Sequence, residues 1–201
     1  LIITEHSFIS QQGKAKEKQL SSAEDKCIDG LKNLVDTIHA CGTKVFAQLN
    51  HAGSASMQKV CIITPIAPSS VILPVKPALG DGSLPREIAK TEIPGIVNDF
   101  VKAARRAKEA GYDGVEIHSA HGYLLNQFYS PLTTHRIDEY GGSLLNRLRI
   151  HREIIHAVRK EVGKEYPISV RFGGCDWMFW KILKSGTSFE NLSHLQRTKF
   201  G

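Results

Sequence analysis

The stretch that most constrains this chain is residues 111–123, which read GYDGVEIHSAHGY. Gly111 is a typical residue to end a helix, and a short apolar segment follows it. A helix, a turn and a buried strand in that order form the repeating unit of an α/β protein. Two imidazoles and a phenol, from His118, His121 and Tyr123, come directly after the strand. Such folds place their chemistry at the carboxyl ends of strands, so this corner is the first candidate site.

The rest of the chain repeats this unit. Apolar stripes at helical steps of three and four alternate with short apolar strands that lack polar alternation. This order predicts a parallel sheet with right-handed crossovers, and either a doubly wound sheet or a (β/α)8 barrel satisfies it. The expected strands are 1–4, 43–49, 114–118 and 167–172, and the expected helices lie between Ser22 and Gly42, over 91–110, and between Ser143 and Gly163.

Two segments do not follow the repeat. Residues 50–90 are rich in proline, serine and glycine, and these prolines exclude a helix interior or a central strand. We expect a long irregular excursion there, of the kind that is functional or mobile. No strand–helix unit can be read after Gly174, and we expect residues 177–201 to form an atypical, poorly ordered tail.

Composition argues against several classes of protein. The 201 residues are 41% hydrophobic and 23% charged, as in an ordinary globular domain. No apolar run approaches the roughly 20 residues that span a bilayer, and no secretory signal is visible, so we expect a cytoplasmic protein without a membrane partner. The four cysteines form no Cys-x-x-Cys pair, which argues against structural zinc and a disulfide framework. The net charge of +6 comes without aromatic residues among the basic ones, so we expect no nucleic-acid partner.

The three side chains at the end of the strand at 114–118 and just after it suit oxyanion and proton chemistry. Neutral imidazoles of His118 and His121 can donate hydrogen bonds to a developing oxyanion. The phenol of Tyr123 stays protonated at pH 7 and can give its proton to a reacting atom. On the residues alone, two alternatives stay open: loop side chains with structural partners, or a metal site with His51 as the third ligand.

Two polar side chains on neighbouring strands can serve the same corner. The amide of Gln48 both donates and accepts hydrogen bonds, which suits a heterocycle with mixed edges. Arg171 lies in an apolar strand, where an unpaired buried charge is costly. Its partner is either Glu116 on the adjacent strand or an electron-rich ligand that gains negative charge. The structural alternatives are a satisfied core glutamine and an internal ion pair.

Three sequence blocks carry a family resemblance. They are QLNHAG at 48–53, GVEIHSAHGYLLNQF at 114–128, and RIDEYGGS at 136–143 followed by Asn146 and Arg147. Together they resemble the Old Yellow Enzyme family, in particular its bacterial branch of NADH:flavin oxidoreductases and 2,4-dienoyl-CoA reductases. The resemblance covers residues 1–176, and its central block is long and specific.

The resemblance implies a cofactor and a role for each candidate residue. Members of this family are (β/α)8 TIM barrels that hold FMN at the carboxyl mouth of the strands. By analogy, Gln48 bonds the pyrimidine edge of the flavin and Arg171 stabilises negative charge on the reduced ring. His118 and His121 match the pair that grips the substrate oxygen, and Tyr123 matches the proton donor. The implied reaction passes hydride from NADH or NADPH through the flavin to a small-molecule substrate, an activated alkene of the enone or enoate type.

The same resemblance implies an incomplete barrel. Residues 1–176 would form a partial FMN-binding domain with strands two to five and their helices, without the first strand and without strands six to eight. The last two strands normally hold the FMN phosphate. An inactive truncated fragment of such an enzyme is therefore the main alternative. A metal-dependent barrel hydrolase that uses His51, His118 and His121 is the other.

Family positions without a chemical role are interpreted as architectural. We expect Arg147 to pair with a carboxylate such as Asp138, and Ser143 to cap the helix that follows it. The resemblance leaves open whether the full-length parent forms a homo-oligomer and whether it carries an iron–sulfur cluster.

Overall fold

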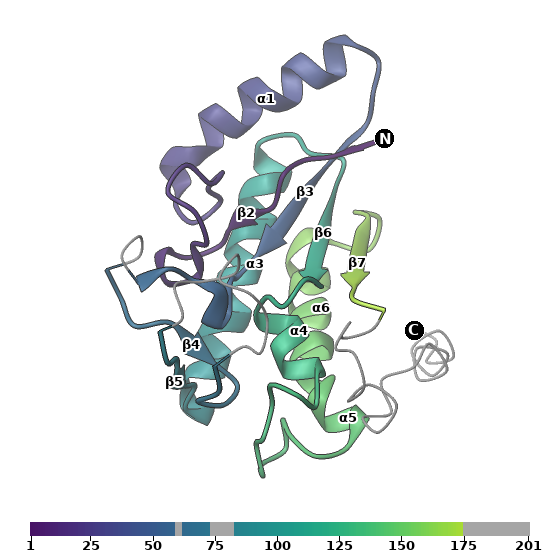
Figure 1. Ribbon diagram of the computed structural model, residues 1–201. Coiled ribbons are helices and arrows are strands. Elements are labelled where there is room, and N and C mark those ends of the chain that lie inside the picture. The colour runs from purple at the N-terminus through teal and green to yellow at the C-terminus, as the bar shows by residue number, and fades with distance from the viewer. Residues whose placement is uncertain (59–61, 73–82, 175–201) are drawn as a thin grey trace.

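The computed structural model describes residues 1–58, 62–72 and 83–174 (Figure 1). The tail expected at 177–201 lies outside the described residues, so its boundary stays a prediction. Of the described helices, none has both the length and the apolar character that a membrane span requires.

The main sheet is parallel throughout, as predicted. A short strand, β2 (Ser7–Phe8), pairs with Leu49 and Asn50 at the end of β3 (Val45–Asn50). Ile2 and Ile3 pair with Val45 and Phe46 at the start of the same strand. The strand order across the sheet is β1 (Ile2–Ile3), β3 (Val45–Asn50), β6 (Gly114–Ser119) and β7 (Ile168–Phe172).

Helices cover the sheet and close the core. α3 (Ile93–Glu109) packs against β3 and β6 and lies beside α6 (Arg149–Val162), while α1 (Ile28–Ala40) packs on α3 and β3 (Figure 1). The helices are α1 (Ile28–Ala40), α3 (Ile93–Glu109), α4 (Leu124–Tyr129), α5 (Leu144–Arg147) and α6 (Arg149–Val162), with short 3-10 turns at Gln11–Gly13, Asp25–Cys27, Gly53–Ala55 and Lys90–Glu92. Gly111 and Gly163 follow α3 and α6 with φ of +92° and +89°, a conformation that glycine adopts without strain. The predicted helix ends are therefore confirmed at these two positions.

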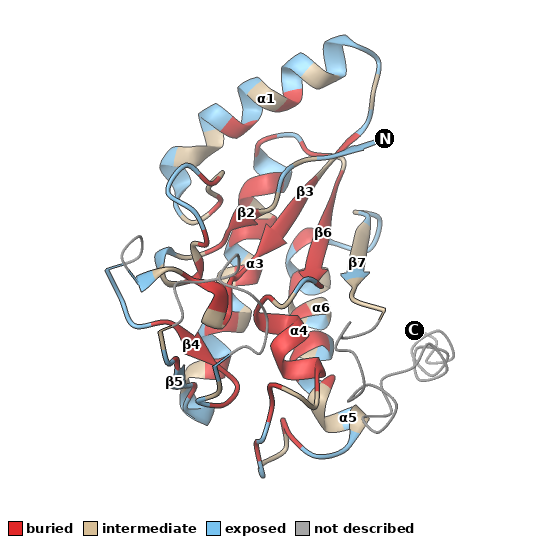
Figure 2. Ribbon diagram, in the orientation of Figure 1, coloured by how far each residue is buried: buried red, intermediate tan, exposed pale blue. Residues whose placement is uncertain are grey.

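The middle strands and the outer strands differ in burial. β3 and β6 are almost wholly buried, whereas β1 is exposed and β7 is half-buried (Figure 2). β1 and β7 stand at the two ends of the strand order. A closed barrel has no free strand edge. The two outer strands of the described sheet are therefore free edges, and the described strands do not form a closed barrel.

The described parts of residues 50–90 are less irregular than their composition predicted. β4 (Ile66–Ala67) and β5 (Arg86–Glu87) pair in a short parallel ladder. The guanidinium Nη1 of Arg136 donates to two backbone carbonyl oxygens of this segment, at 3.0 and 2.7 Å. A ladder of two residues per strand is too short to show a periodic pattern, so it could not be predicted.

Two predictions concern the region after Tyr129: the helix cap at Ser143 is confirmed, and the ion pair between Arg147 and Asp138 is not. The Oγ of Ser143 accepts a hydrogen bond from a backbone N–H in the first turn of α5, at 3.3 Å. Asp138 pairs with Arg136, at 2.5 Å between Oδ2 and Nη2. Arg147 instead donates from Nε to the carbonyl oxygen of Tyr129, at 2.7 Å. The predicted pair between Arg147 and Asp138 was wrong, because a nearer guanidinium occupies the carboxylate.

Candidate active site

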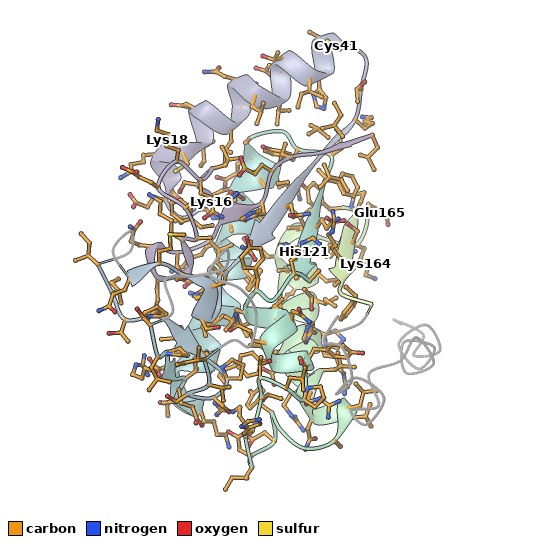
Figure 3. The ribbon with its side chains drawn as sticks, viewed as in Figure 1. Lys16, Lys18, Cys41, His121, Lys164 and Glu165 are labelled. Atoms are coloured by element: carbon orange, nitrogen blue, oxygen red, sulfur yellow. The ribbon has the colours of Figure 1, made fainter. Side chains whose placement is uncertain are left out.

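A cavity of about 300 Å³ lies where the strands of the main sheet end. Side chains from the end of β1, from β3, from β6 and the turn after it, and from β7 meet around it. His121, labelled in Figure 3, lies beside β6 and β7. The cavity is lined by Ile3, Thr4, Glu5, His6, Gln48, His118, His121, Tyr123 and Arg171. All five residues predicted as site residues therefore border one cavity.

His118 is the most deeply buried of these histidines, with 1% of its surface exposed. Burial, together with the charges of His121, His6 and Arg171, lowers the pKa of His118 to about 3. Its Nδ1 is buried without a hydrogen-bond partner among the described residues. A buried polar atom of this kind requires an explanation, and a ligand group in the cavity is one. His118 is thus a neutral imidazole at pH 7 with an unused polar atom.

His121 owes its position to a strained turn. Its φ is +58° and that of Gly122 is +74°, so two successive residues adopt the left-handed conformation directly after β6. A non-glycine residue in this region stores strain, which is frequent at functional sites. The turn brings the ring of His121 to 5.1 Å from the ring of His118, edge to face. Burial and the charge of Arg171 lower the pKa of His121, which favours its neutral form.

Tyr123 precedes the first turn of α4 and faces the same cavity. Its ring centroid lies 5.2 Å from that of His118. Burial raises the pKa of Tyr123, and the carboxylate of Glu5 raises it further. The phenol is therefore protonated at pH 7, as a proton donor must be.

Gln48 and Arg171 border the cavity from the two strands beside β6. The Nε2 of Gln48 donates to Oε1 of Glu116 at 2.6 Å, which fixes the amide. Arg171 stands opposite His118 in the register of β6 and β7, and its side chain is exposed. Of the ion pairs between described residues, none involves Arg171. The alternative of an ion pair between Arg171 and Glu116 was wrong, because Glu116 bonds Gln48 and β7 lies at the sheet edge.

Four cavity residues, Ile3, Thr4, Glu5 and His6, were not predicted from the sequence, and His6 is the one that reaches the phenol of Tyr123. Ile3 pairs with Phe46 and Ser7 with Leu49, so three residues of the first segment face two residues of β3. One extra residue of this kind is a bulge, which redirects side chains and is common beside active sites. The ring of His6 lies 5.0 Å from that of Tyr123. The signal was available, because a polar side chain directly after a strand is the same pattern that selected the other histidines.

His51 does not join this group. It is buried, and its Nδ1 accepts the backbone N–H of Gly53 at 3.1 Å. Burial lowers the pKa of His51 to about 4. Among residues 1–58, 62–72 and 83–174, no three His, Cys, Asp or Glu side chains come together as metal ligands. The geometry therefore gives no support to the metal-dependent hydrolase alternative.

Comparison with known proteins places the chain in a family. The family described as NADH:flavin oxidoreductase / NADH oxidase matches residues 1–197. This chain belongs to that family. It is 42% identical over 180 residues to an NADH oxidase of Thermoanaerobacter brockii, covering 89% of this chain and 27% of that protein. It is 41% identical over 177 residues to an NADPH dehydrogenase of Clostridium acetobutylicum, covering 88% of this chain and 50% of that protein.

The fold of this flavin oxidoreductase family member agrees with solved structures. The old yellow enzyme homologue from Zymomonas mobilis matches with a TM-score of 0.79 at 36% identity, over 85% of this chain and 49% of that one. Morphinone reductase matches with a TM-score of 0.76 at 35% identity, over 85% of this chain and 48% of that one. The predicted partial (β/α)8 barrel is confirmed. The chain spans half or less of the length of these relatives.

The cavity fits the ring of a flavin better than its phosphate. Gln48 offers an amide, and Arg171 offers a cation without a carboxylate partner among the described residues. These groups suit a polar heterocycle that accepts negative charge. Among the described residues around the cavity, Arg171 is the only cation, and the phosphate would need residues elsewhere.

Proposed function

We propose that this chain contributes the substrate side of the active site of an FMN-dependent oxidoreductase, which transfers hydride from NADH or NADPH to an activated alkene. One observation carries the proposal. Three groups that are neutral at pH 7, His118, His121 and Tyr123, line a cavity that the cation of Arg171 also borders. Family membership supports flavin and nicotinamide as the redox partners.

His118 and His121 would polarise the substrate. A neutral imidazole donates a hydrogen bond to a carbonyl or carboxyl oxygen and stabilises negative charge that develops there. The low pKa of His118, about 3, keeps this ring from becoming an acid that competes with Tyr123 near neutral pH. The β-carbon of an enone bound in this way becomes electron-poor and can accept a hydride, which FMN reduced by NADH or NADPH would supply.

Tyr123 would complete the reduction. After the β-carbon has received hydride, the α-carbon carries the electron pair and needs a proton. The phenol O–H of Tyr123 breaks and a C–H bond forms at the α-carbon, which leaves the negative charge on the phenol oxygen. The buried phenol is protonated at pH 7 and lines the cavity, so it meets both requirements of the donor.

Gln48 and Arg171 would hold the flavin ring. Glu116 orients the amide of Gln48 through a 2.6 Å hydrogen bond, and this leaves the amide oxygen and one N–H for other partners. The guanidinium of Arg171 is placed opposite His118 and can stabilise negative charge on a reduced ring.

FMN titration tests this assignment. We expect Gln48→Leu and Arg171→Gln to weaken FMN binding by the complete gene product about ten- to a hundredfold each, since each removes a charged or polar contact to the ring. Fluorescence quenching of FMN measures the affinity. Arg152→Gln, at an exposed position on α6, is the matched control and should bind FMN as the parent does.

The titration also separates the proposal from the truncated-fragment alternative. The 201-residue chain alone is titrated beside the complete gene product. FMN binding by the complete gene product only is the outcome expected if strands beyond this chain hold the phosphate. Tight binding by the 201-residue chain would refute the inactive fragment, and no binding by either would refute the flavin site.

A further inference from the structure

His6 lines the cavity and makes several hydrogen bonds, but the proposed function gives it no role. Its Nδ1 lies 2.8 Å from Nε2 of Gln19 and 3.2 Å from Nδ2 of Asn50. Its Nε2 lies 3.4 Å from the phenol oxygen of Tyr123. One end of the ring therefore contacts two amides, and the other end contacts the proposed proton donor.

The orientation of Gln19 is fixed by two backbone contacts. Its Oε1 accepts the N–H of Ala15 at 2.7 Å, so this atom must be the oxygen. Its Nε2 donates to the carbonyl oxygen of His6 at 3.1 Å, so this atom must be the nitrogen. An amide NH₂ can only donate. The Nδ1 of His6 must therefore be the acceptor in the bond with Gln19.

The tautomer of His6 follows from this acceptor role. Burial lowers the pKa of His6, Lys16 and His121 add to the lowering, and Glu5 opposes it. The ring is therefore neutral at pH 7, and a neutral imidazole carries one proton. With Nδ1 unprotonated, the proton is on Nε2, the atom that faces Tyr123. The phenol oxygen then accepts this bond, and its own proton is left for another acceptor.

We propose that His6 is a positioning residue for Tyr123: its Nε2–H donates to the phenol oxygen and so directs the phenol proton into the cavity. The proposal rests on the role of Tyr123 in the proposed function. His6 keeps its proton throughout. It stabilises the phenolate that remains after the O–H proton has moved to the substrate carbon, because a hydrogen bond to a charged oxygen is stronger than one to a neutral oxygen. The 3.4 Å separation is long, and such bonds tighten when the substrate is bound.

The surroundings of His6 support a hydrogen bond donated from its Nε2 to the phenol oxygen of Tyr123. Glu5, directly before it, raises the pKa of Tyr123, so a donor to the phenol oxygen offsets the cost that the carboxylate adds to a phenolate. His118 and Tyr123 pack their rings against His6, at 5.8 and 5.0 Å. The titratable and charged groups that line the cavity with His6 are Glu5, His118, His121, Tyr123 and Arg171, while Lys16 lowers the pKa of His6 without lining the cavity. Lys16, labelled in Figure 3, comes from the loop after β2.

Nitrogen NMR tests the tautomer without cofactor or substrate. The complete gene product is labelled with ¹⁵N in its histidines, and His6→Gln assigns the His6 signals by their loss. We expect Nε2 to carry the proton and Nδ1 to be bare at pH 7. A proton on Nδ1 would overturn the proposal, because Nε2 would then accept from Tyr123.

Two substitutions of similar size each remove the hydrogen bond that His6 donates to the phenol oxygen. Gln19→Glu replaces the donating amide with a carboxylate, which should move the His6 proton to Nδ1 and turn Nε2 into an acceptor. His6→Phe keeps a ring and removes the donor. We expect each to slow reoxidation of reduced flavin by an enone about tenfold, and to slow flavin reduction by NADH or NADPH less. His6→Gln, whose amide can also donate, should recover part of the rate.

The alkaline limb of the pH profile separates positioning from packing. A donor to the phenol oxygen lowers the pKa of Tyr123, so its removal in His6→Phe should move the limb to higher pH by about one unit. His156→Phe, on the exposed side of α6, is the control and should leave the limb in place. An unshifted limb in His6→Phe would overturn the proposal. A parent protein whose flavin is never reduced, or whose Tyr123→Phe variant reoxidises normally, would instead refute the proposed function.

Discussion

Replacing Tyr123 with phenylalanine is expected to slow reoxidation of the reduced flavin by an enone about 10²–10⁴-fold, the range that a general acid contributes. The substitution removes the O–H bond that supplies the proton and keeps the ring that packs against His118. Reduction of the flavin by NADH or NADPH needs no proton from this phenol, so that half-reaction should change little. Stopped-flow absorbance, followed separately for the two half-reactions, measures both rates.

Tyr166→Phe is the matched control for this experiment. Its phenol donates to the carbonyl oxygen of Tyr112 at 2.9 Å, and it is not among the residues that line the cavity. It should therefore lose a structural hydrogen bond without a selective effect on alkene-driven reoxidation. Equal slowing of both half-reactions in Tyr123→Phe would contradict the proton-donor role and indicate a general disturbance of the site.

His118→Leu is expected to have the second-largest effect, a loss of about 10²–10³-fold in kcat/KM for the alkene, comparable to the removal of one oxyanion donor. The leucine fills the buried position but cannot donate to the substrate oxygen. Because the pKa of His118 is about 3, the ring is already neutral at pH 5, and the parent rate should show no inflection from His118 between pH 5 and 8. Steady-state kinetics across this pH range measures both the loss in kcat/KM and the shape of the pH profile.

His118→Asn distinguishes a donor from a packing group. An asparagine amide can donate to the substrate oxygen, so it should recover part of the rate that leucine loses. His156→Leu, at an exposed position, is the control and should have no effect on the alkene reaction. A rate for His118→Leu close to that of the parent, with a stable and flavin-loaded protein, would mean that His118 acts through packing alone.

The sequence was sufficient for the parts of the site that lie at strand ends. Gly111 ends a helix, the apolar segment after it is a strand, and parallel pairing then brings His118 beside Arg171 on the next strand. Each step depends on neighbours in the chain or on the fixed geometry of parallel strands. For the same reason Gln48, on the strand before, reaches the same cavity.

The remaining features depend on contacts that no periodic pattern encodes. The bulge that directs His6 into the cavity arises from the register of two short segments with β3. The choice of Arg136 over Arg147 as the partner of Asp138 depends on where the loop after α4 folds back. The exposure of Arg171 follows from its strand being at the end of the sheet order, which the apolar sequence of that strand does not reveal.

The absorbance spectrum of the flavin tests the central claim most directly. The complete gene product is loaded with FMN, kept without oxygen, and mixed first with NADH or NADPH and then with an enone. We predict that the yellow absorbance bleaches on the first addition and returns on the second. A protein that takes up no FMN, or whose reduced flavin does not recover with any activated alkene, would contradict the assignment of this cavity.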